Sequence, residues 1–357
     1  MISIRRHSAR LTAGLVAVGL LAACSSSGSG NSSGGGSSAL KGTTADGPAV
    51  KAPVICDKAA EGGDPAGKTG AAITLAVNPW TGSAVNANVA KVVLEAQLGT
   101  TVNLVDLDEN ATWVGMDKGE IDGVLEVWPS GHAADVQTYV TDKKSVVCMG
   151  LLGPAAKIGW YVPTAVVKEH PELATWQGFA DAKLAKLFAT PESGDLGQFL
   201  MGDPSYVTFD EQIIANLKLP LKYVVAGSES ALLTAIDKAV ADKTPLLLQF
   251  WKPHWKQLKV ELTEVKLPEL TQACLDSAKA ADGKYACDYA ADTLFKAASA
   301  GLAKKNPAAM AFLEKLSLTT DQQSQIAGYV DADGMTPLDA AKKWVDANPD
   351  VVKGWLG

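Results

Sequence analysis

Short apolar runs alternate with helical segments from Ala71 onward, and this alternation limits the chain to a small set of folds. Strands are predicted at 72–77, 101–107, 121–128, 221–225 and 245–250. Helices are predicted at 83–98, 111–118, 133–141, 208–219 and 228–241. From about Pro268 the chain is expected to be helical, with a restart at Thr336-Pro337. This order predicts an α/β fold with mostly parallel sheets, which binds ligands at the carboxyl ends of its strands.

The strands fall into two groups, which predicts two lobes that face a central cleft. We assign residues 71–157 together with 260–357 to one lobe and residues 158–259 to the other. The links between them are expected near 152–161 and 259–266. A single continuous sheet is the alternative arrangement.

The N-terminal residues are typical of an exported, lipid-anchored protein. Residues 1–23 combine three arginines with an apolar stretch too short to span a membrane, as in a signal peptide. The stretch ends in LAAC, with Cys24 last, which resembles the lipobox of bacterial lipoproteins, where this cysteine is acylated. Residues 24–70 begin with a Ser/Gly-rich stretch expected to be a flexible tether. We therefore expect a protein at the outer face of the cytoplasmic membrane, and a secretory signal with an incidental cysteine is the alternative.

Charge and cysteine content exclude several classes of function. Loss of residues 1–23 would move the formal net charge from −7 to −10, and an acidic chain without basic runs argues against nucleic-acid partners. Export makes disulfides the expected state of the four remaining cysteines, which allow three pairings. We favour Cys274–Cys287, whose short intervening loop contains Asp282-Gly283, and this leaves Cys56–Cys148. The histidines do not stand at metal-ligand spacing, so we expect no metal and no cofactor.

Tryptophan is more frequent than either other large aromatic residue, with nine Trp against seven Phe and seven Tyr. Three of them, Trp80, Trp128 and Trp251, end apolar runs and have a proline within two residues. Convergent indole faces suit diffuse cations such as quaternary ammonium groups. We interpret these three as walls of a cation site, and ordinary core packing is the alternative.

The segment 202–211, with the sequence GDPSYVTFDE, predicts an anion site. Thr208 and Glu211 have the spacing of a capping box, so a helix is expected to start there. Free backbone N–H groups at such a start bind carboxylates, whereas a start capped only by its own side chains is the alternative. Tyr206 lies beside these amides and is a candidate for a further aromatic wall.

With these segments assembled, residues 71–357 resemble the glycine betaine-binding proteins of ABC transporters. The resemblance rests on ITLAVNPW ending at Trp80, EVWPSGH ending at His132, the turn at 202–211, and FWKPHW starting at Phe250, in this order behind the lipobox. It implies a two-lobed, periplasmic-binding-protein-like (type II) fold with a central cleft. Ser205-Tyr206-Val207 replaces a glycine-rich turn of the family, which leaves the identity of the ligand open.

The resemblance also implies roles for individual residues. Trp80, Trp128 and Trp251 would form a cage around a trimethylammonium group. The side chain of His132 and the backbone N–H groups of Val207 and Thr208 would bind the ligand's carboxylate, and Tyr206 would be a further wall. Three cation–π contacts of about 0.5–2 kcal/mol each fall short of the roughly 8 kcal/mol of micromolar binding. We therefore expect the hydrogen bonds to the ligand's carboxylate to contribute to affinity. Choline, which has no carboxylate, should bind less well.

The implied function is a lipid-anchored, monomeric receptor that delivers glycine betaine or a related osmoprotectant to an ABC permease. Proline betaine, carnitine, dimethylsulfoniopropionate and choline are alternative ligands. An extracellular hydrolase of a betaine or choline ester is a different class of function, but the chain has no G-x-S-x-G or H-E-x-x-H motif. A sensory lipoprotein, which binds its ligand for signalling only, is a third class of function. We expect no enzyme activity.

Overall fold

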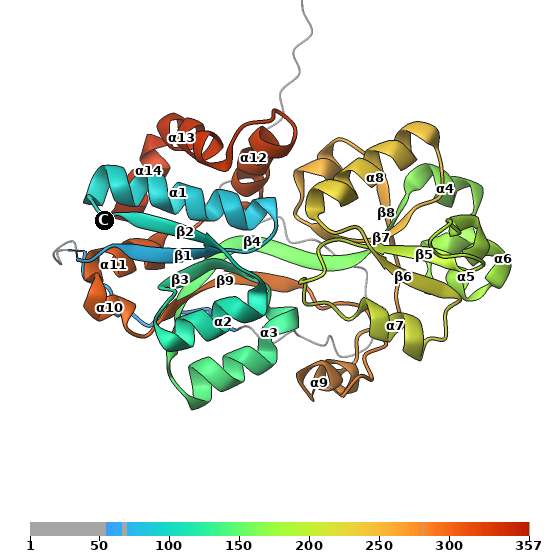
Figure 1. The fold of residues 1–357 in the computed structure, drawn as a ribbon, viewed down its shortest axis with the longest axis horizontal. Coiled ribbons are helices and arrows are strands. Elements are labelled where there is room, and N and C mark those ends of the chain that lie inside the picture. Colours follow the sequence, from blue (N-terminus) through green and yellow to red (C-terminus); the bar gives the residue numbers. More distant parts are fainter. Residues whose placement is uncertain (1–54, 66–69, 281, 357) are drawn as a thin grey trace, which may run out of the picture. The chain divides into compact units, whose positions relative to one another are not determined.

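A mixed sheet of nine strands runs through the part of the chain that the structure, a computed structural model, describes: residues 55–65, 70–280 and 282–356 (Figure 1). The strand order is β2-β1-β3-β9-β4-β7-β5-β6, and β8 pairs with β4. The predicted signal peptide at 1–23, the predicted acylation site Cys24 and the Ser/Gly-rich stretch of the predicted tether lie outside the described residues.

One long strand joins two groups of strands. We call β2, β1, β3 and β9 the first half of the sheet, and β7, β5, β6 and β8 the second half. β4 pairs with β9 along Val146–Ala156, and with β7 and β8 along Lys157–Pro163. Hydrogen bonding between strands is therefore continuous from one half to the other. The strand bounds are β1 Ile73–Val77, β2 Val102–Asp106, β3 Gly123–Val127, β4 Val146–Pro163, β5 Gly197–Met201, β6 Leu221–Val225, β7 Leu247–Lys252, β8 Leu262–Val265 and β9 Asp292–Ser299.

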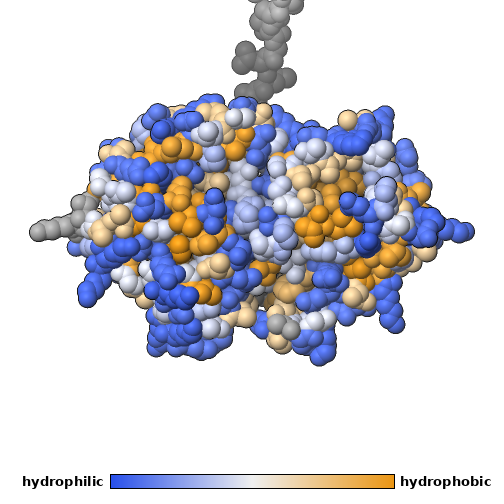
Figure 2. Space-filling model, in the orientation of Figure 1, coloured by the Kyte–Doolittle hydropathy of each residue, from blue (hydrophilic) through white to orange (hydrophobic). Residues whose placement is uncertain are grey.

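Helices cover both faces of each half. In Figure 1, α1, α12 and α13 lie on one face of the first half, and α2 and α3 lie on the other. The helix bounds are α1 Thr81–Leu98, α2 Glu109–Lys118, α3 Pro129–Asp135, α4 Thr164–Glu169, α5 Trp176–Ala180, α6 Ala182–Ala185, α7 Asp210–Asn216, α8 Glu229–Asp242, α9 Gln272–Ala280, α10 Leu302–Lys305, α11 Pro307–Lys315, α12 Thr320–Asp331, α13 Pro337–Ala347 and α14 Pro349–Leu356. No described helix is long and apolar enough to cross a membrane. Figure 2 shows hydrophilic and hydrophobic residues interspersed over one face of the molecule.

The predicted α/β class is correct, but the sheet is less parallel than expected. β1 pairs in parallel with β2 and β3, and β5 with β6 and β7. Every pairing of β4 and β9 is antiparallel. The prediction that everything after Pro268 is helical is wrong for β9, which lies between β3 and β4.

Helix boundaries agree with the sequence where a cap is local. Gly99 ends α1 with a positive φ of 61°, Ser228 caps α8 by accepting the N–H of Ala231, and Thr336 caps α13. Ser83 does not start α1 as predicted. The helix begins two residues earlier, and the Ser83 hydroxyl accepts the N–H of Asn78, the residue after β1.

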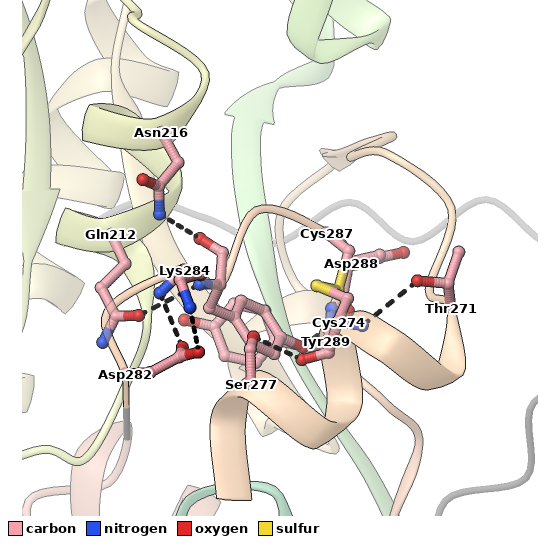
Figure 3. Close-up of a disulfide and its surroundings, with 11 residues drawn as sticks. Gln212, Asn216, Thr271, Cys274, Ser277, Asp282, Lys284, Cys287, Asp288 and Tyr289 are labelled. Carbon is pink, nitrogen blue, oxygen red and sulfur yellow. Dashed lines mark hydrogen bonds and ion pairs between the residues drawn. A yellow bond between two sulfur atoms is a disulfide. The ribbon is translucent and has the colours of Figure 1, made fainter. Parts of the chain in front are cut away.

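Both favoured disulfides are present in the structure. Cys56–Cys148 ties a residue before β1 to β4, and Cys274–Cys287 joins a residue of α9 to a residue 13 positions later. Figure 3 shows the second bond beside the segment that carries Tyr289.

Candidate functional site

Four aromatic rings from different elements line one pocket. Trp80 follows β1 and Trp128 follows β3, so the parallel pairing of these strands brings both residues to the same edge of the sheet. Trp251 lies near the end of β7, and Tyr206 lies in the loop between β5 and α7. The full lining is Trp80, Glu109, Trp128, Ile158, Tyr206, Val207, Thr208, Gln249 and Trp251.

Tyr206 joins the rings of the two halves. Its ring centroid lies 5.9 Å from that of Trp80 and 5.8 Å from that of Trp251, edge to face in both cases. Its hydroxyl donates to the carbonyl oxygen of Pro79 at 3.1 Å. The rings enclose a small cavity.

A buried carboxylate fixes two of the indoles. Oε1 of Glu126, in β3, accepts the indole N–H of Trp80 at 2.8 Å and that of Trp128 at 3.0 Å. Oε2 accepts from the side-chain amides of Asn86 at 2.6 Å and Gln323 at 2.7 Å. Burial raises the pKa of Glu126 to about 7, although the hydrogen bonds from the two indoles act in the opposite direction.

A second carboxylate, that of Glu109, borders the pocket itself. Glu109 is the first residue of α2 and is 8% exposed. Its Oε1 accepts the backbone N–H of Val207 at 3.0 Å, and its Oε2 lies 2.6 Å from Nε2 of His132. The Val207 N–H that we expected to bind the ligand is therefore bonded to a protein side chain.

His132 is placed differently from the other predicted site residues. It is 1% exposed and is not among the residues that line the pocket. Its Nδ1 lies 2.8 Å from Asp135, so both ring nitrogens face carboxylates. Burial alone would lower the pKa of His132, but the charge of Glu109 and the hydrogen bonds to Asp135 and Glu109 raise it to about 9. Its predicted contact with the ligand stays a prediction.

The segment 206–208 reaches the pocket without the predicted capping box. α7 begins at Asp210, after Phe209, and none of the side chains that the structure describes caps it. The buried Asp210 carboxylate instead accepts from the indole of Trp160 at 2.7 Å and the hydroxyl of Tyr289 at 2.9 Å. Among the described residues, none accepts the backbone N–H of Thr208, which borders the pocket.

Beside the aromatic pocket, three side chains of types that can bind a metal ion lie close together. One oxygen or nitrogen atom of each of Glu229, His254 and Asp331 falls within 4.8 Å of the others. Each group already has a protein partner. Glu229 accepts the N–H of Thr81 at 2.6 Å and pairs with His254 at 2.9 Å, and Asp331 accepts the indole N–H of Trp255 at 2.6 Å. In this structure the cluster is a hydrogen-bonded contact between α8, α12 and the start of α1.

Of the candidate site residues, the structure brings together around one pocket Trp80, Trp128, Tyr206, Val207, Thr208 and Trp251. Sequence reasoning missed Glu109, Glu126 and Gln249. Glu126 had a usable signal, because it stands two residues before Trp128 and residues i and i+2 of a strand point to the same side. Glu109 had a weaker one, because it is the acidic first residue of a helix that follows a strand.

Comparison with known proteins identifies the family. Residues 71–347 match the substrate-binding domain of ABC-type glycine betaine transport systems, and the chain belongs to this family. The family comprises the solute-binding components of these importers. A trimethylamine N-oxide-binding protein of Pelagibacter ubique is 29% identical over 284 residues, which cover 78% of this chain and 88% of that protein. A glycine betaine/carnitine transport binding protein of Listeria monocytogenes is 30% identical over 129 residues, 36% of this chain and 37% of that protein.

Solved structures confirm the periplasmic-binding-protein-like fold. Lactococcal OpuAC in its closed complex with glycine betaine aligns with a TM-score of 0.62 at 21% identity, over 80% of this chain and all of that one (100%). An ABC-transporter choline-binding protein in complex with choline aligns with a TM-score of 0.64 at 19% identity, over 80% of this chain and 91% of that one.

Proposed function

We propose that this family member captures a small trimethylammonium compound without a carboxylate group, such as trimethylamine N-oxide or choline, and delivers it to an ABC importer. The cage would be formed by Trp80, Trp128, Tyr206 and Trp251. Indole faces attract a permanent cation and accept its methyl surface, and each contact contributes about 0.5–2 kcal/mol.

The carboxylate of Glu109 is the observation that carries this choice of ligand. It borders the pocket and occupies the Val207 N–H that would otherwise be free for a ligand anion. Two like charges 4 Å apart repel by about 4 kcal/mol at the effective dielectric constant typical near a protein surface. A ligand carboxylate beside Glu109 would meet this repulsion, whereas a cation would be attracted.

Glycine betaine is the second candidate. It is supported by the family, by the free N–H of Thr208, and by the raised pKa of His132, which keeps a positive charge behind Glu109 at neutral pH. Carnitine and the other carboxylate-bearing ligands would meet Glu109 in the same way as glycine betaine.

Calorimetric titration with trimethylamine N-oxide, choline, glycine betaine and carnitine tests the proposal. We expect the two ligands without a carboxylate to bind at least tenfold more tightly than the other two. Tighter binding of glycine betaine would contradict the assignment and would favour the earlier hypothesis that the site binds a ligand carboxylate. Mass spectrometry of the recovered ligand should show it unchanged, because a receptor alters no bond in its ligand.

We also propose that acylated Cys24 and the tether after it hold the receptor at the outer face of the membrane as a monomer. Residues 71–157 with 260–357, and residues 158–259, would be the lobes that close on the ligand. Incorporation of labelled palmitate should be lost in Cys24→Ala, and the variant should leave the membrane fraction. Unchanged labelling would contradict the lipobox assignment.

A further inference from the structure

Gln249 is a buried polar side chain that borders the pocket and has no hydrogen-bond partner among the described residues. It lies in β7, is 2% exposed, and stands two residues before Trp251, so both side chains project from the same face of the strand. Its Oε1 is buried and accepts no hydrogen bond, and among the described residues none accepts from its Nε2.

An unsatisfied amide in this position is unusual. Buried side-chain amides nearly always find hydrogen-bond partners, because burying one without a partner costs free energy that folding does not recover. The neighbouring pocket walls offer mainly ring and methyl surface, from Trp251 and from Ile158, which is the partner of Trp251 in β4. The partner that remains for Gln249 is what occupies the pocket.

We propose that Gln249 determines ligand specificity by hydrogen bonding to a single oxygen substituent, an N-oxide oxygen or a hydroxyl, beside the ligand's ammonium group. This inference rests on the proposed function, because it assumes that the rings hold a methylated ammonium. A side-chain amide carries both N–H donors and a carbonyl acceptor, so it can donate to an N-oxide oxygen or exchange hydrogen bonds with a hydroxyl.

The two polar groups of the pocket thus have different tasks. Glu109 is already bonded to Val207 and His132 and acts mainly through its charge, which disfavours ligand carboxylates. Gln249 is neutral and unbonded, so it distinguishes ligands that carry an oxygen from those that carry only methyl groups. The free N–H of Thr208 is a second donor for the same oxygen.

Tetramethylammonium, which fills the cage but has no oxygen, isolates the contribution of Gln249. We expect wild-type protein to bind trimethylamine N-oxide or choline about tenfold more tightly than tetramethylammonium, as one well-formed hydrogen bond allows. In Gln249→Met this preference should fall to about twofold or less, while the affinity for tetramethylammonium changes little. Gln177→Met, at an exposed position on α5, is the matched control and should keep the wild-type preference.

An unchanged preference in Gln249→Met would overturn the role of Gln249 and leave the cage intact. If none of these ligands binds wild-type protein, the proposed function fails instead. For the case that the variant does not fold, wild-type protein labelled with ¹⁵N in glutamine side chains provides a second test. One buried amide resonance should shift with trimethylamine N-oxide but not with tetramethylammonium, and equal shifts with both would overturn the inference.

Discussion

The carboxylate of Glu109 accepts the backbone N–H of Val207 at 3.0 Å, which joins the start of α2 to the loop before α7. The bond connects the two halves of the sheet at the pocket. It also occupies the Val207 N–H, a donor that the sequence predicted would bind the ligand. We therefore propose that the charge at this position, more than the aromatic rings, decides which methylated amine the site accepts.

Replacing Glu109 with Gln should shift the ligand preference toward glycine betaine. The variant keeps an acceptor for the Val207 N–H but removes the charge that repels a ligand carboxylate. We expect the ratio of choline affinity to glycine betaine affinity to fall by at least tenfold in calorimetric titrations. Glu120→Gln removes one negative charge from an exposed position just after α2 and should leave the ratio unchanged. An equal effect of both substitutions would mean that only overall charge matters.

Cation binding should become tighter as the pH rises through about 7. Burial raises the pKa of Glu126 to about 7, so this carboxylate gains its charge across that range and then attracts a bound cation more strongly. The other charged groups near the cage are Glu109 from α2, Glu229 from α8, His254 after β7 and Asp331 from α12. Dissociation constants measured from pH 6 to 8 should fall several-fold.

In Glu126→Gln the same pH series should be nearly flat. Gln is close in size to Glu, and Asn86 can rotate its amide to present Oδ1, which has no partner among the described residues of the wild-type protein. A wild-type slope that persists in this variant would assign the pH dependence to another of these groups.

His132 should stabilise the fold below neutral pH and lose this effect in alkali. Its pKa is raised to about 9 in the folded protein, against about 6.5 in an unfolded chain. The contribution is therefore fully present below about pH 6.5 and is lost as the pH rises through about 9, and its size is on the order of a few kcal/mol.

Urea unfolding of wild-type protein and His132→Gln at pH 6 and pH 9.5 measures this contribution. The difference in unfolding free energy between the two proteins should be large at pH 6 and small at pH 9.5. The comparison has to be made as a difference, because burial lowers the pKa of Lys296 to about 7 and changes stability in the opposite sense over the same range. A difference that does not depend on pH would mean that His132 is not charged in the folded protein.

The sequence predicted those parts of the fold and site that depend on local pattern. Trp80 and Trp128 were identifiable because each ends an apolar run, and parallel pairing of β1 and β3 then places them together. β9 was missed because its sequence, DTLFKAAS, contains a lysine and two alanines that favour a helix. Lys296 is tolerated in this buried strand only because its ammonium group reaches the carbonyl oxygens of Leu313, Glu314 and Leu316 at the end of α11.

The polar contacts of the pocket could not be predicted in this way. Glu109 and Val207 are 98 residues apart in the sequence. Gln249 can be recognised as a pocket residue only once the fold places the other lining residues beside it. The capping box predicted at Thr208 failed for a similar reason. Asp210 is bonded to Trp160 and Tyr289, which lie far away in sequence, and these contacts set where α7 begins.

Removal of one disulfide should mainly lower the stability of the fold, and removal of the other should mainly lower ligand affinity. Cys56–Cys148 joins residues 92 apart and Cys274–Cys287 joins residues 13 apart, so chain entropy predicts a loss of stability of about 5 and about 3 kcal/mol, respectively. The loss of ligand affinity should instead be larger when Cys274–Cys287 is removed than when Cys56–Cys148 is removed. Tyr289 follows the Cys274–Cys287 loop by two residues, and its hydroxyl accepts the N–H of Phe209 at 2.8 Å just after the segment 206–208.

Paired Cys→Ser variants of each disulfide separate these effects. Removing Cys274–Cys287 should loosen the support of the segment 206–208 and weaken ligand binding several-fold, with the smaller change in the midpoint of urea unfolding. Removing Cys56–Cys148 should give the larger change in the midpoint and little change in affinity where the protein remains folded, because that bond lies away from the residues that line the pocket. Equal loss of affinity in both variants would show that affinity follows overall stability and not the support that Tyr289 gives to the loop.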